Sequence, residues 1–327
     1  MIYSSNNLSH HLDHNSSKKG QSMPKAVQFN EYGPITVLQV VKVSKPEPRE
    51  REILVAVKAA GINPGEDKIR QGLVHNRWPA TFPSGEGTDF AGIVAKVGSE
   101  VNDFSVGDKV AGYTHNRASH AEYVIVSEDN LTLKPDEVSW EVAGSLFVAG
   151  TTAVGALQAV DLKPNETIVI SGAAGGVGSI VAQLAAVNGG RVYGVAGNRD
   201  IEWLITHNIT PISYDENVAG KIKRLVGAPD AFIDTVGKGY VKMAIELNIP
   251  EYRIDTIVDF QAAQTYDVKI DGSAAASAIS VLSDLLQKIA DGVLDVPVAK
   301  TFPLDKVQDA FTFLTTEHHR GKVVLIP

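Results

Sequence analysis

The feature that most constrains this chain is a glycine-rich turn between an apolar run and a helical segment, in VISGAAGGVGSIVAQLAA (169–186). Gly172, Gly175 and Gly178 follow at a spacing of three, with Gly176 beside the middle one. A strand, a glycine turn and a helix in this order place backbone N–H groups and the positive helix end where a pyrophosphate can rest. The turn therefore predicts a dinucleotide-binding unit, and glycines needed only for packing are the alternative.

The pattern of apolar runs divides the chain into a β-rich half and an alternating half. Between residues 25 and 148, short β-rich runs separated by Gly, Pro and Asp predict a small β-barrel. From Gly150 onward, strands and helices alternate, which is typical of a doubly wound parallel sheet and predicts an α/β protein. The expected strands of that sheet are 167–171, 191–195, 211–214, 231–234, 253–258 and 268–270. The expected helices are 178–187, 219–226, 274–292 and 304–316, and a last strand is expected at 321–327.

Charge and composition argue against several classes of function. The net charge of −8 gives no basic excess to offset phosphates, so a surface that coats nucleic acid or adheres to a membrane is not expected. Nowhere does the sequence hold the run of about 20 apolar residues that a membrane span needs. The absence of cysteine excludes disulfides and thiolate metal sites, and it fits a reducing, cytoplasmic compartment.

The first 22 residues differ in composition from the rest of the chain. They are rich in Ser, Asn and His and lack the apolar core of a signal peptide, and Met23 opens the apolar-periodic part. We therefore expect residues 1–22 to be a disordered leader or tag rather than a functional arm.

The end of the second strand of the dinucleotide unit predicts the cofactor. NAD enzymes usually place Asp or Glu there for the ribose hydroxyls, whereas NADP enzymes place a basic residue for the 2′-phosphate. Here the strand ends GVAGNRD, with no acid before Asn198 and with Arg199 and Asp200 following. Because a guanidinium can hold two phosphate oxygens, Asn198 and Arg199 are candidate contacts and NADPH is the expected cofactor. A solvated Arg199 at the start of a helix is the alternative.

Six segments carry a resemblance to a known family. They are AAGINPGEDKIRQG (59–72), FPSGEGTDFAGIVAKVGSEVNDFSVGDKVAG (82–112), VAGTTAVGAL (148–157), GAAGGVGSIVAQLA (172–185), DAFIDTVG (230–237) and the ending RGKVVLIP. Together they resemble the zinc-independent quinone oxidoreductases, the ζ-crystallin-like branch of the medium-chain dehydrogenase/reductase superfamily. The resemblance implies a GroES-like β-barrel catalytic domain (23–148), an NADPH-binding Rossmann domain (149–291) and a C-terminal segment (292–327) that returns to the catalytic domain. A homodimer is expected.

The resemblance also implies positions for the site residues. Asn63 matches an asparagine beside the nicotinamide, Thr152 a threonine that opens the linking helix, and Tyr214 a tyrosine near the adenosine phosphate. Arg320 lies near the place where relatives bring a C-terminal basic residue towards the 2′-phosphate. In the glycine turn the expected cofactor contacts are Gly175, Gly176, Val177 and Gly178.

Simpler roles stay open for several of these residues. Asn63 precedes a proline and could be a turn former, and Thr152 could be a helix N-cap. Tyr214 could be a half-buried strand residue. Two further candidates come from the cleft: Tyr113 to hold a developing oxyanion and Phe260 to close over the nicotinamide.

No metal site is predicted. Where zinc-using relatives place Cys, Gly-His-Glu and a second Cys, this chain has Asn63, GTD (87–89) and FVAGTT (147–152). A site built from His75, His115 and His120 is formally possible, but their spacing suggests no common helix face, so surface or pocket-lining histidines are favoured.

The sequence therefore predicts an NADPH-dependent, zinc-independent reductase of small-molecule quinones or α,β-unsaturated carbonyls. Two alternatives from other classes stay open, a non-catalytic NADPH-binding protein and a single-stranded RNA-binding protein of the same fold. The acidic net charge argues against the second of these.

Overall fold

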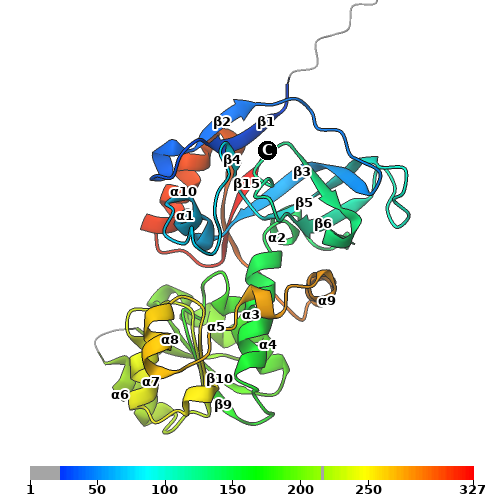
Figure 1. Ribbon diagram of the computed structural model, residues 1–327. Helices are drawn as coiled ribbons and strands as arrows, with labels where there is room; N and C mark the ends of the chain where they lie inside the picture. The colour runs from blue at the N-terminus through cyan, green and yellow to red at the C-terminus, as the bar shows by residue number, and fades with distance from the viewer. Residues whose placement is uncertain (1–22, 215–216) are drawn as a thin grey trace, which may run out of the picture.

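The computed structural model describes residues 23–214 and 217–327, so the expected leader, residues 1–22, lies outside the described part. The described elements form two bodies, one above the other in Figure 1. One body is rich in antiparallel strands and the other is a parallel sheet flanked by helices. The predicted α/β fold class, a β-barrel next to a doubly wound sheet, is confirmed.

The first body, which we call the barrel body, is built from two sheets. The small sheet contains β1 (Lys25–Phe29), β2 (Gln39–Lys42) and β4 (Ser84–Gly85). The large sheet contains β3 (Glu52–Ile62), β5 (Asp89–Val97), β6 (Lys109–Tyr113), β7 (Tyr123–Ser127), β8 (Leu131–Leu133), β14 (Val298–Pro303) and β15 (Lys322–Ile326). Because β15 pairs with β3 and β14 pairs with β15, the end of the chain completes a sheet that began near its start.

The second body, which we call the sheet body, has five parallel strands in the order β11-β10-β9-β12-β13. They are β9 (Thr167–Ser171), β10 (Arg191–Ala196), β11 (Thr210–Ser213), β12 (Ala231–Asp234) and β13 (Ile254–Thr256). All five residues of β9 are buried, as expected for a central strand covered on both faces. The strand predicted at 268–270 was wrong, because in the described chain this segment contributes a single bridge between Lys269 and Asp255.

Ten α-helices are assigned in the described chain. Those of the barrel body are α1 (Pro64–Arg70), α2 (Trp140–Ala143) and α10 (Val307–Thr316). The others are α3 (Phe147–Ala159), α4 (Gly178–Val187), α5 (Ile201–Thr206), α6 (Val218–Leu225), α7 (Tyr240–Glu246), α8 (Phe260–Tyr266) and α9 (Ile279–Ala290). The helix predicted from residue 274 begins later because Ala278 is extended. Since α3 begins at Phe147, Thr152 lies inside this helix and neither opens nor caps it.

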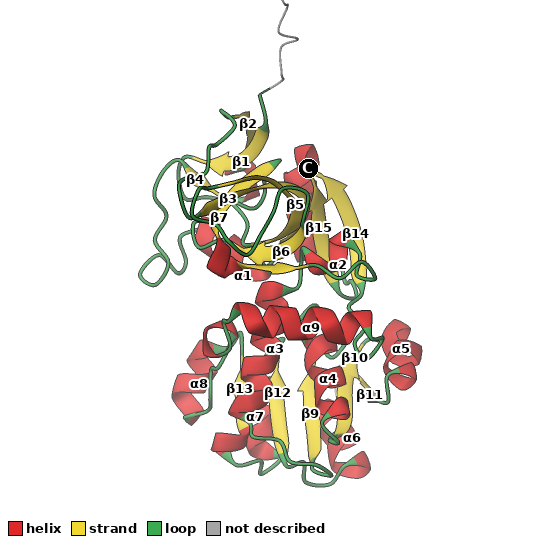
Figure 2. Ribbon diagram, turned by 90° about the vertical axis from the view of Figure 1, so that its right-hand side faces the viewer, coloured by secondary structure: helices red, strands yellow, loops and turns green. Residues whose placement is uncertain are grey.

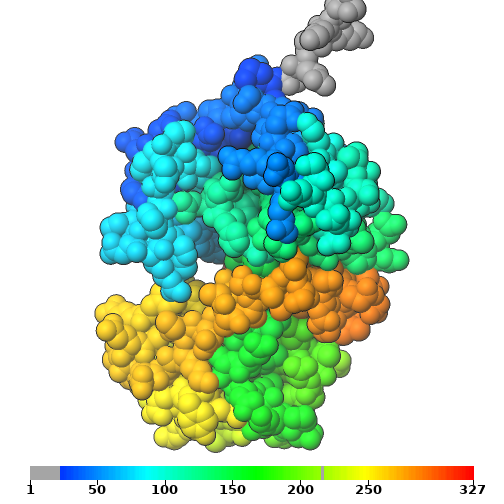
Figure 3. Space-filling model, turned by 45° about the vertical axis from the view of Figure 1, so that its right-hand side comes forward, coloured from blue at the N-terminus to red at the C-terminus, as the bar shows by residue number. Residues whose placement is uncertain are grey.

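The carboxyl ends of the parallel strands point at the barrel body, as Figure 2 shows. Helix α9 lies across the junction and contacts both α3 and β8. Figure 3 shows the surface hollowed between the bodies, where the cyan segment around α1 faces the gold segment around α8. The ends of parallel strands beside such a hollow are where open α/β sheets bind ligands.

Candidate functional site

The glycine turn at the carboxyl end of β9 contains two kinds of glycine. Gly172 has φ +64°, and a Cβ there would lie 2.7 Å from Thr235 Oγ1; a Cβ on Gly178 would lie 2.1 Å from the Gly172 carbonyl oxygen. These two positions are glycine because of packing. By contrast, a Cβ on Gly175 or Gly176 would have its nearest neighbour at 3.2 Å. The backbone at Gly175 and Gly176 is partly exposed, whereas Gly178 is buried, so the middle of the turn is the part that a phosphate can approach, which fits a dinucleotide.

Asp234, at the end of β12, fixes the loops around this turn. One carboxylate oxygen accepts from Ser171 Oγ at 2.7 Å and from the Gly237 backbone N–H at 2.9 Å, and the other accepts from Thr256 Oγ1 at 3.0 Å. The side chain is fully buried. Asp234 thereby ties together the carboxyl ends of three adjacent strands, β9, β12 and β13. The sequence analysis did not identify it, although an acid after a buried run of three apolar residues was a clue.

The turn before β15 lies directly on the glycine turn. Gly321 N–H donates to the Ala174 carbonyl at 3.1 Å, and the two turns form a parallel bridge between Gly175 and Gly321. Gly321 has φ +81°, and a Cβ on it would lie 1.9 Å from the Pro297 carbonyl oxygen, so no side chain fits there. The C-terminal segment is in this way seated on the dinucleotide unit.

Three basic side chains converge on the buried carboxylate of Asp200. Arg199 Nε, His318 Nε2 and Arg320 Nε each lie 3.9 Å from one of its oxygens. The side chains of the two arginines are 53% and 38% exposed, so both can reach a ligand. The structure thus brings together Arg199 and Arg320, which are far apart in sequence, and it adds His318, which the sequence analysis missed.

Tyr214 and Asn198 border this basic cluster. The ring of Tyr214 meets the ring of His318 edge to face, with centroids 5.7 Å apart. Tyr214 directly follows β11 and is 50% exposed, so its half-buried ring lies at the end of the strand rather than within it. Asn198 Oδ1 accepts from Ser213 Oγ at 2.7 Å, which orients the start of the loop that carries Arg199. Positive charge beside an aromatic face suits an adenosine phosphate.

Asn63 lies in a buried polar cluster at the edge of the barrel body. Its Nδ2 donates to Asp89 Oδ2 at 3.3 Å and to Glu66 Oε1 at 3.4 Å, and its Oδ1 accepts from Lys322 Nζ at 2.7 Å. Its backbone N–H donates to Glu66 Oε2 at 3.0 Å, which caps the start of α1. The residue is 6% exposed, so most of its side chain contacts protein.

The ionisable members of this cluster are strongly perturbed. Burial raises the pKa of Glu66 and of Asp89 to about 7 in each case, against the opposing effect of the nearby Lys322 ammonium. Burial likewise lowers the pKa of Lys322 below its ordinary value. The other Asp89 oxygen accepts from the Val148 backbone N–H at 3.1 Å. The cluster therefore joins β3, β5, β15 and the first turn of α3.

The remaining predicted residues are Tyr113, Thr152, Phe260 and Val177. Tyr113 is stacked on Phe147 with ring centroids 3.8 Å apart, and burial raises the pKa of its phenol. Thr152 Oγ1 donates to the Val148 carbonyl at 2.6 Å. Phe260 is the first residue of α8 and is 43% exposed. Val177 immediately precedes α4.

Glu66, Asp89 and Lys322 are not among the site residues that the sequence predicts. Clues were present, because Asn63 and Glu66 have the spacing of a capping box, and Lys322 opens an otherwise apolar strand. No pattern in the sequence shows that these charges meet, since Lys322 and Asn63 are 259 residues apart.

The structure does not bring the three candidate histidines together as a metal site. Within residues 23–214 and 217–327, no group of three or more His, Cys, Asp or Glu side chains could hold a metal ion. His120 is fully buried, and its Nε2 lies 3.1 Å from the Gly61 carbonyl oxygen. Burial lowers its pKa to about 4, so it is neutral at physiological pH.

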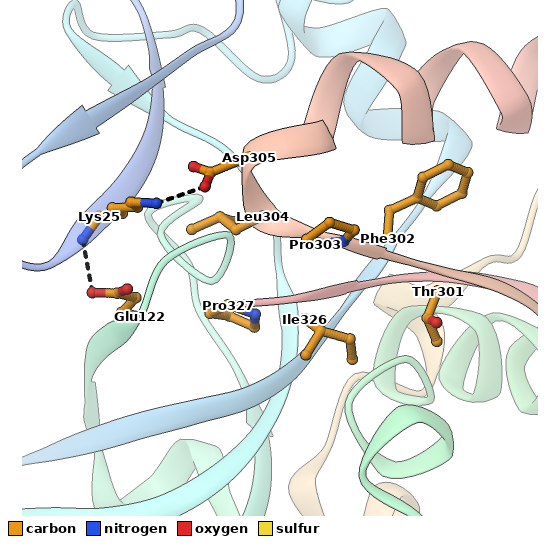
Figure 4. Close-up of a pocket in the computed structure, with 9 residues that line it drawn as sticks. All are labelled: Lys25, Glu122, Thr301, Phe302, Pro303, Leu304, Asp305, Ile326 and Pro327. Carbon is orange, nitrogen blue, oxygen red and sulfur yellow. Dashed lines mark hydrogen bonds and ion pairs between the residues drawn. The ribbon is translucent and has the colours of Figure 1, made fainter.

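A separate cavity of about 420 Å³ opens near the end of β15 (Figure 4). The ammonium of Lys25 pairs with Asp305 at 2.6 Å there, and its backbone N–H donates to Glu122 at 3.0 Å. Its lining residues are Lys25, Glu122, Thr301, Phe302, Pro303, Leu304, Asp305, Ile326 and Pro327. None of these is a predicted site residue, so the cavity is separate from the predicted cofactor site.

Comparisons with known proteins agree with this geometry. Residues 49–136 match the alcohol dehydrogenase GroES-like domain family, and residues 212–325 match the zinc-binding dehydrogenase family. The NADPH-dependent alkenal/one oxidoreductase of Arabidopsis thaliana chloroplasts is 30% identical over 94% of this chain and 81% of its own length. Quinone oxidoreductase 1 of Escherichia coli K12 is 29% identical over 93% of this chain and its own full length.

Solved structures are similar over nearly the whole described chain. The quinone oxidoreductase of Coxiella burnetii has a TM-score of 0.82 at 30% identity and covers 93% of this chain and 99% of its own. The Escherichia coli quinone oxidoreductase in complex with NADPH has a TM-score of 0.80 at 26% identity and covers 93% and 100%. The fold, the glycine turn and these relatives all indicate the same family. The chain is an oxidoreductase that belongs to the quinone oxidoreductase branch of the medium-chain dehydrogenase/reductase superfamily.

Proposed function

We propose that this oxidoreductase is an NADPH-dependent reductase of quinones or α,β-unsaturated carbonyls. The observation that carries the proposal is the basic cluster around Asp200, which lies shortly after the end of β10, one strand from the glycine turn. An adenosine 2′-phosphate needs positive charge at this end of a dinucleotide site. The relatives named for quinones and alkenals support the substrate class.

In this proposal the chain holds the cofactor along the carboxyl ends of β9 and β10. The backbone of the glycine turn and the start of α4 receive the pyrophosphate. The guanidinium groups of Arg199 and Arg320 hold the 2′-phosphate, with Asn198 and Tyr214 beside them. Thr152 and Phe260 lie towards the nicotinamide end. The residues of the glycine turn with this role are Gly175, Gly176, Val177 and Gly178.

NADPH, when bound, supplies a hydride from C4 of its nicotinamide. The contribution of the chain is to orient the two reactants and to hold the charge that develops on the substrate oxygen. Tyr113 is the proposed donor to that oxygen, since a phenol is protonated at neutral pH and burial raises its pKa further. Asn63 is the proposed polar contact beside the nicotinamide, and solvent supplies the proton that completes the reduction.

Two broader features belong to the same proposal. The protein acts in this proposal as a homodimer in the cytoplasm, and the lack of cysteine fits such a reducing compartment. Within residues 23–214 and 217–327, no helix is long and apolar enough to cross a membrane.

The test follows NADPH and NADH oxidation with a panel of quinones and enones, for the unchanged protein and for Arg199→Ala. We expect turnover with NADPH, and the variant should raise KM for NADPH and leave KM for NADH within about twofold. Arg191→Ala is the matched control, because Arg191 is exposed at the opposite end of β10. Equal losses with both cofactors would show that Arg199 does not contact the 2′-phosphate. Lack of turnover with every substrate would overturn the reductase proposal.

A further inference from the structure

The buried cluster around Asn63 contains one cation whose place in the fold is unusual. Lys322 is the first residue of β15, and its side chain is 4% exposed, among the apolar strands of the barrel body. A buried ammonium is costly unless it is paired. Here it has charged partners on two other elements, Glu66 on α1 and Asp89 on β5, and both act to raise its pKa against burial. Because burying this ammonium costs free energy, we ask which contacts of Lys322 use it.

The polar end of Lys322 determines how the Asn63 amide is oriented. Its Nζ donates to Asn63 Oδ1 at 2.7 Å, and the Ile62 carbonyl is 3.4 Å away. The amide hydrogens of Asn63 then point to the two carboxylates, Asp89 and Glu66. If the Asn63 amide were flipped, its hydrogens would face the Lys322 ammonium and its oxygen would face the two carboxyl groups. The observed orientation is therefore favoured.

The apolar stem of Lys322 lies on the dinucleotide unit. A Cβ on Gly176 would meet Lys322 Cδ at 3.2 Å, and no atom is nearer to that position. The residue before Lys322, Gly321, is hydrogen-bonded to Ala174 in the glycine turn. One side chain therefore contacts Asn63 in the barrel body with its ammonium and the cofactor turn of the sheet body with its methylenes.

We propose that Lys322 is a positioning residue that couples the two bodies, fixing Asn63 with its ammonium while its stem lies against the glycine turn. This inference rests on the proposed function, in which Asn63 acts beside the nicotinamide. Lys322 itself acts through Asn63 and through Gly176. It differs in this from Arg199 and Arg320, which hold the cofactor directly.

The test is the variant Lys322→Met, which keeps a stem of similar length and removes the ammonium. We expect the dissociation constant for NADPH to stay within threefold, because the stem still covers Gly176. The kcat should fall tenfold or more, because Asn63 is released. Lys300→Met is the matched control, since Lys300 is exposed on β14, opposite Val323 in the neighbouring strand, and it should change neither quantity.

A double-variant cycle separates positioning from a general loss of structure. If Lys322 acts through Asn63, the double variant Asn63→Ala/Lys322→Met should be no slower than the slower single variant, within twofold. The fluorescence emission of bound NADPH, which reports on the nicotinamide environment, should change in both single variants and no further in the double variant. If the two substitutions act independently, so that their losses of kcat multiply and their changes in emission add in the double variant, the inference is overturned.

The pH dependence gives a second criterion. The charged groups facing Lys322 are Glu66 and Asp89, with Glu86 and His120 behind Glu66. Protonating the carboxyls removes the need for a counter-charge, so the deficit of Lys322→Met in kcat should shrink at least threefold between pH 8 and pH 6. A deficit that is constant with pH would contradict a charge-dependent role.

Two outcomes are kept distinct by this design. If the unchanged protein reduces no quinone or enone, the proposed function fails. The comparison of bound NADPH emission in the single and double variants needs no substrate, so it still tests the role of Lys322. If Lys322→Met does not fold, the charge-matched variant Asp89→Asn/Lys322→Met replaces it. That variant should fold, and because Glu66 keeps its charge it should still show a smaller, at least threefold, loss of kcat relative to Asp89→Asn. Full kcat in it would overturn the role of Lys322.

Discussion

Replacing Gly176 by valine should separate binding of the cofactor from stability of the fold. The nearest atoms to a Cβ at this position are Lys322 Cδ at 3.2 Å and the Gly321 carbonyl oxygen at 3.6 Å. The first belongs to the stem of Lys322, which can shift by a few tenths of an ångström although its ammonium is held by Asn63. The free energy of unfolding should therefore change by about 1 kcal/mol or less.

The cost to binding should be much larger, because the valine side chain crowds the turn against Lys322 and Gly321 and displaces the backbone N–H groups that would receive the pyrophosphate. A hydrogen bond to a charged group contributes about 1.5–3 kcal/mol. Loss of two such bonds from the turn raises Kd for NADPH on the order of 100-fold to 10,000-fold. Titration of NADPH emission measures Kd, and urea denaturation measures the free energy of unfolding.

Gly178→Ala provides the contrasting variant. Its Cβ would lie 2.1 Å from the Gly172 carbonyl oxygen, so the backbone itself must move. We expect this smaller substitution to lower the free energy of unfolding by about 1–3 kcal/mol, as overpacking does elsewhere. A folded Gly176→Val protein that binds NADPH as tightly as the unchanged chain would refute the assignment of the turn to the cofactor.

Three further predictions follow from the buried cluster and the expected lack of a metal. Asn63→Ala should lower kcat/KM about 10- to 100-fold, and it should also lower the unfolding free energy by more than about 1 kcal/mol, because three buried charged partners lose a hydrogen bond. A loss of stability with full activity would reduce Asn63 to a structural role. Between about pH 4.5 and 7 the unfolding free energy should fall as pH rises. Glu66 and Asp89 have folded pKa values of about 7, above their ordinary values, and so favour the folded state only while protonated. His120, with a pKa of about 4, opposes this between about pH 4 and 6.5, so the net fall should amount to a few kcal/mol; a rise in urea-denaturation stability over this range would contradict the burial of the two carboxyls. Treatment with a chelator should leave activity unchanged, and a loss restored by zinc would contradict zinc independence.

The parts of the fold that the sequence predicted are those with local causes. The strand of Thr167–Ser171 is a mostly apolar run, and Gly178 is required by packing against Gly172 a few residues earlier, so both can be recognised in the sequence. The strand Val298–Pro303 was missed because it is largely exposed and lies at a sheet edge, where side chains carry no apolar pattern. The helix expected from residue 274 was placed too early, since alanine propensity alone does not reveal a turn.

The candidate site was less predictable because it depends on contacts between distant segments. Arg199 and Arg320 could each be proposed separately, but their meeting at Asp200 follows from the return of the chain along β15. Asn63 could be identified by its motif, whereas its partner Lys322 gave no local indication of its pairing. Long-range pairing of charges is set by the topology and is not encoded in a short pattern.

The most direct test of the account is the fate of the hydride. The protein is incubated with an α,β-unsaturated ketone and with NADPH carrying deuterium at C4 on either face, and the product is examined by mass spectrometry. We predict that NADPH is oxidised in an amount equal to the product formed, and that one of the two labelled cofactors transfers its deuterium to carbon. Bound NADPH that is not oxidised by any enone or quinone, or product that contains no deuterium from either cofactor, would contradict the account.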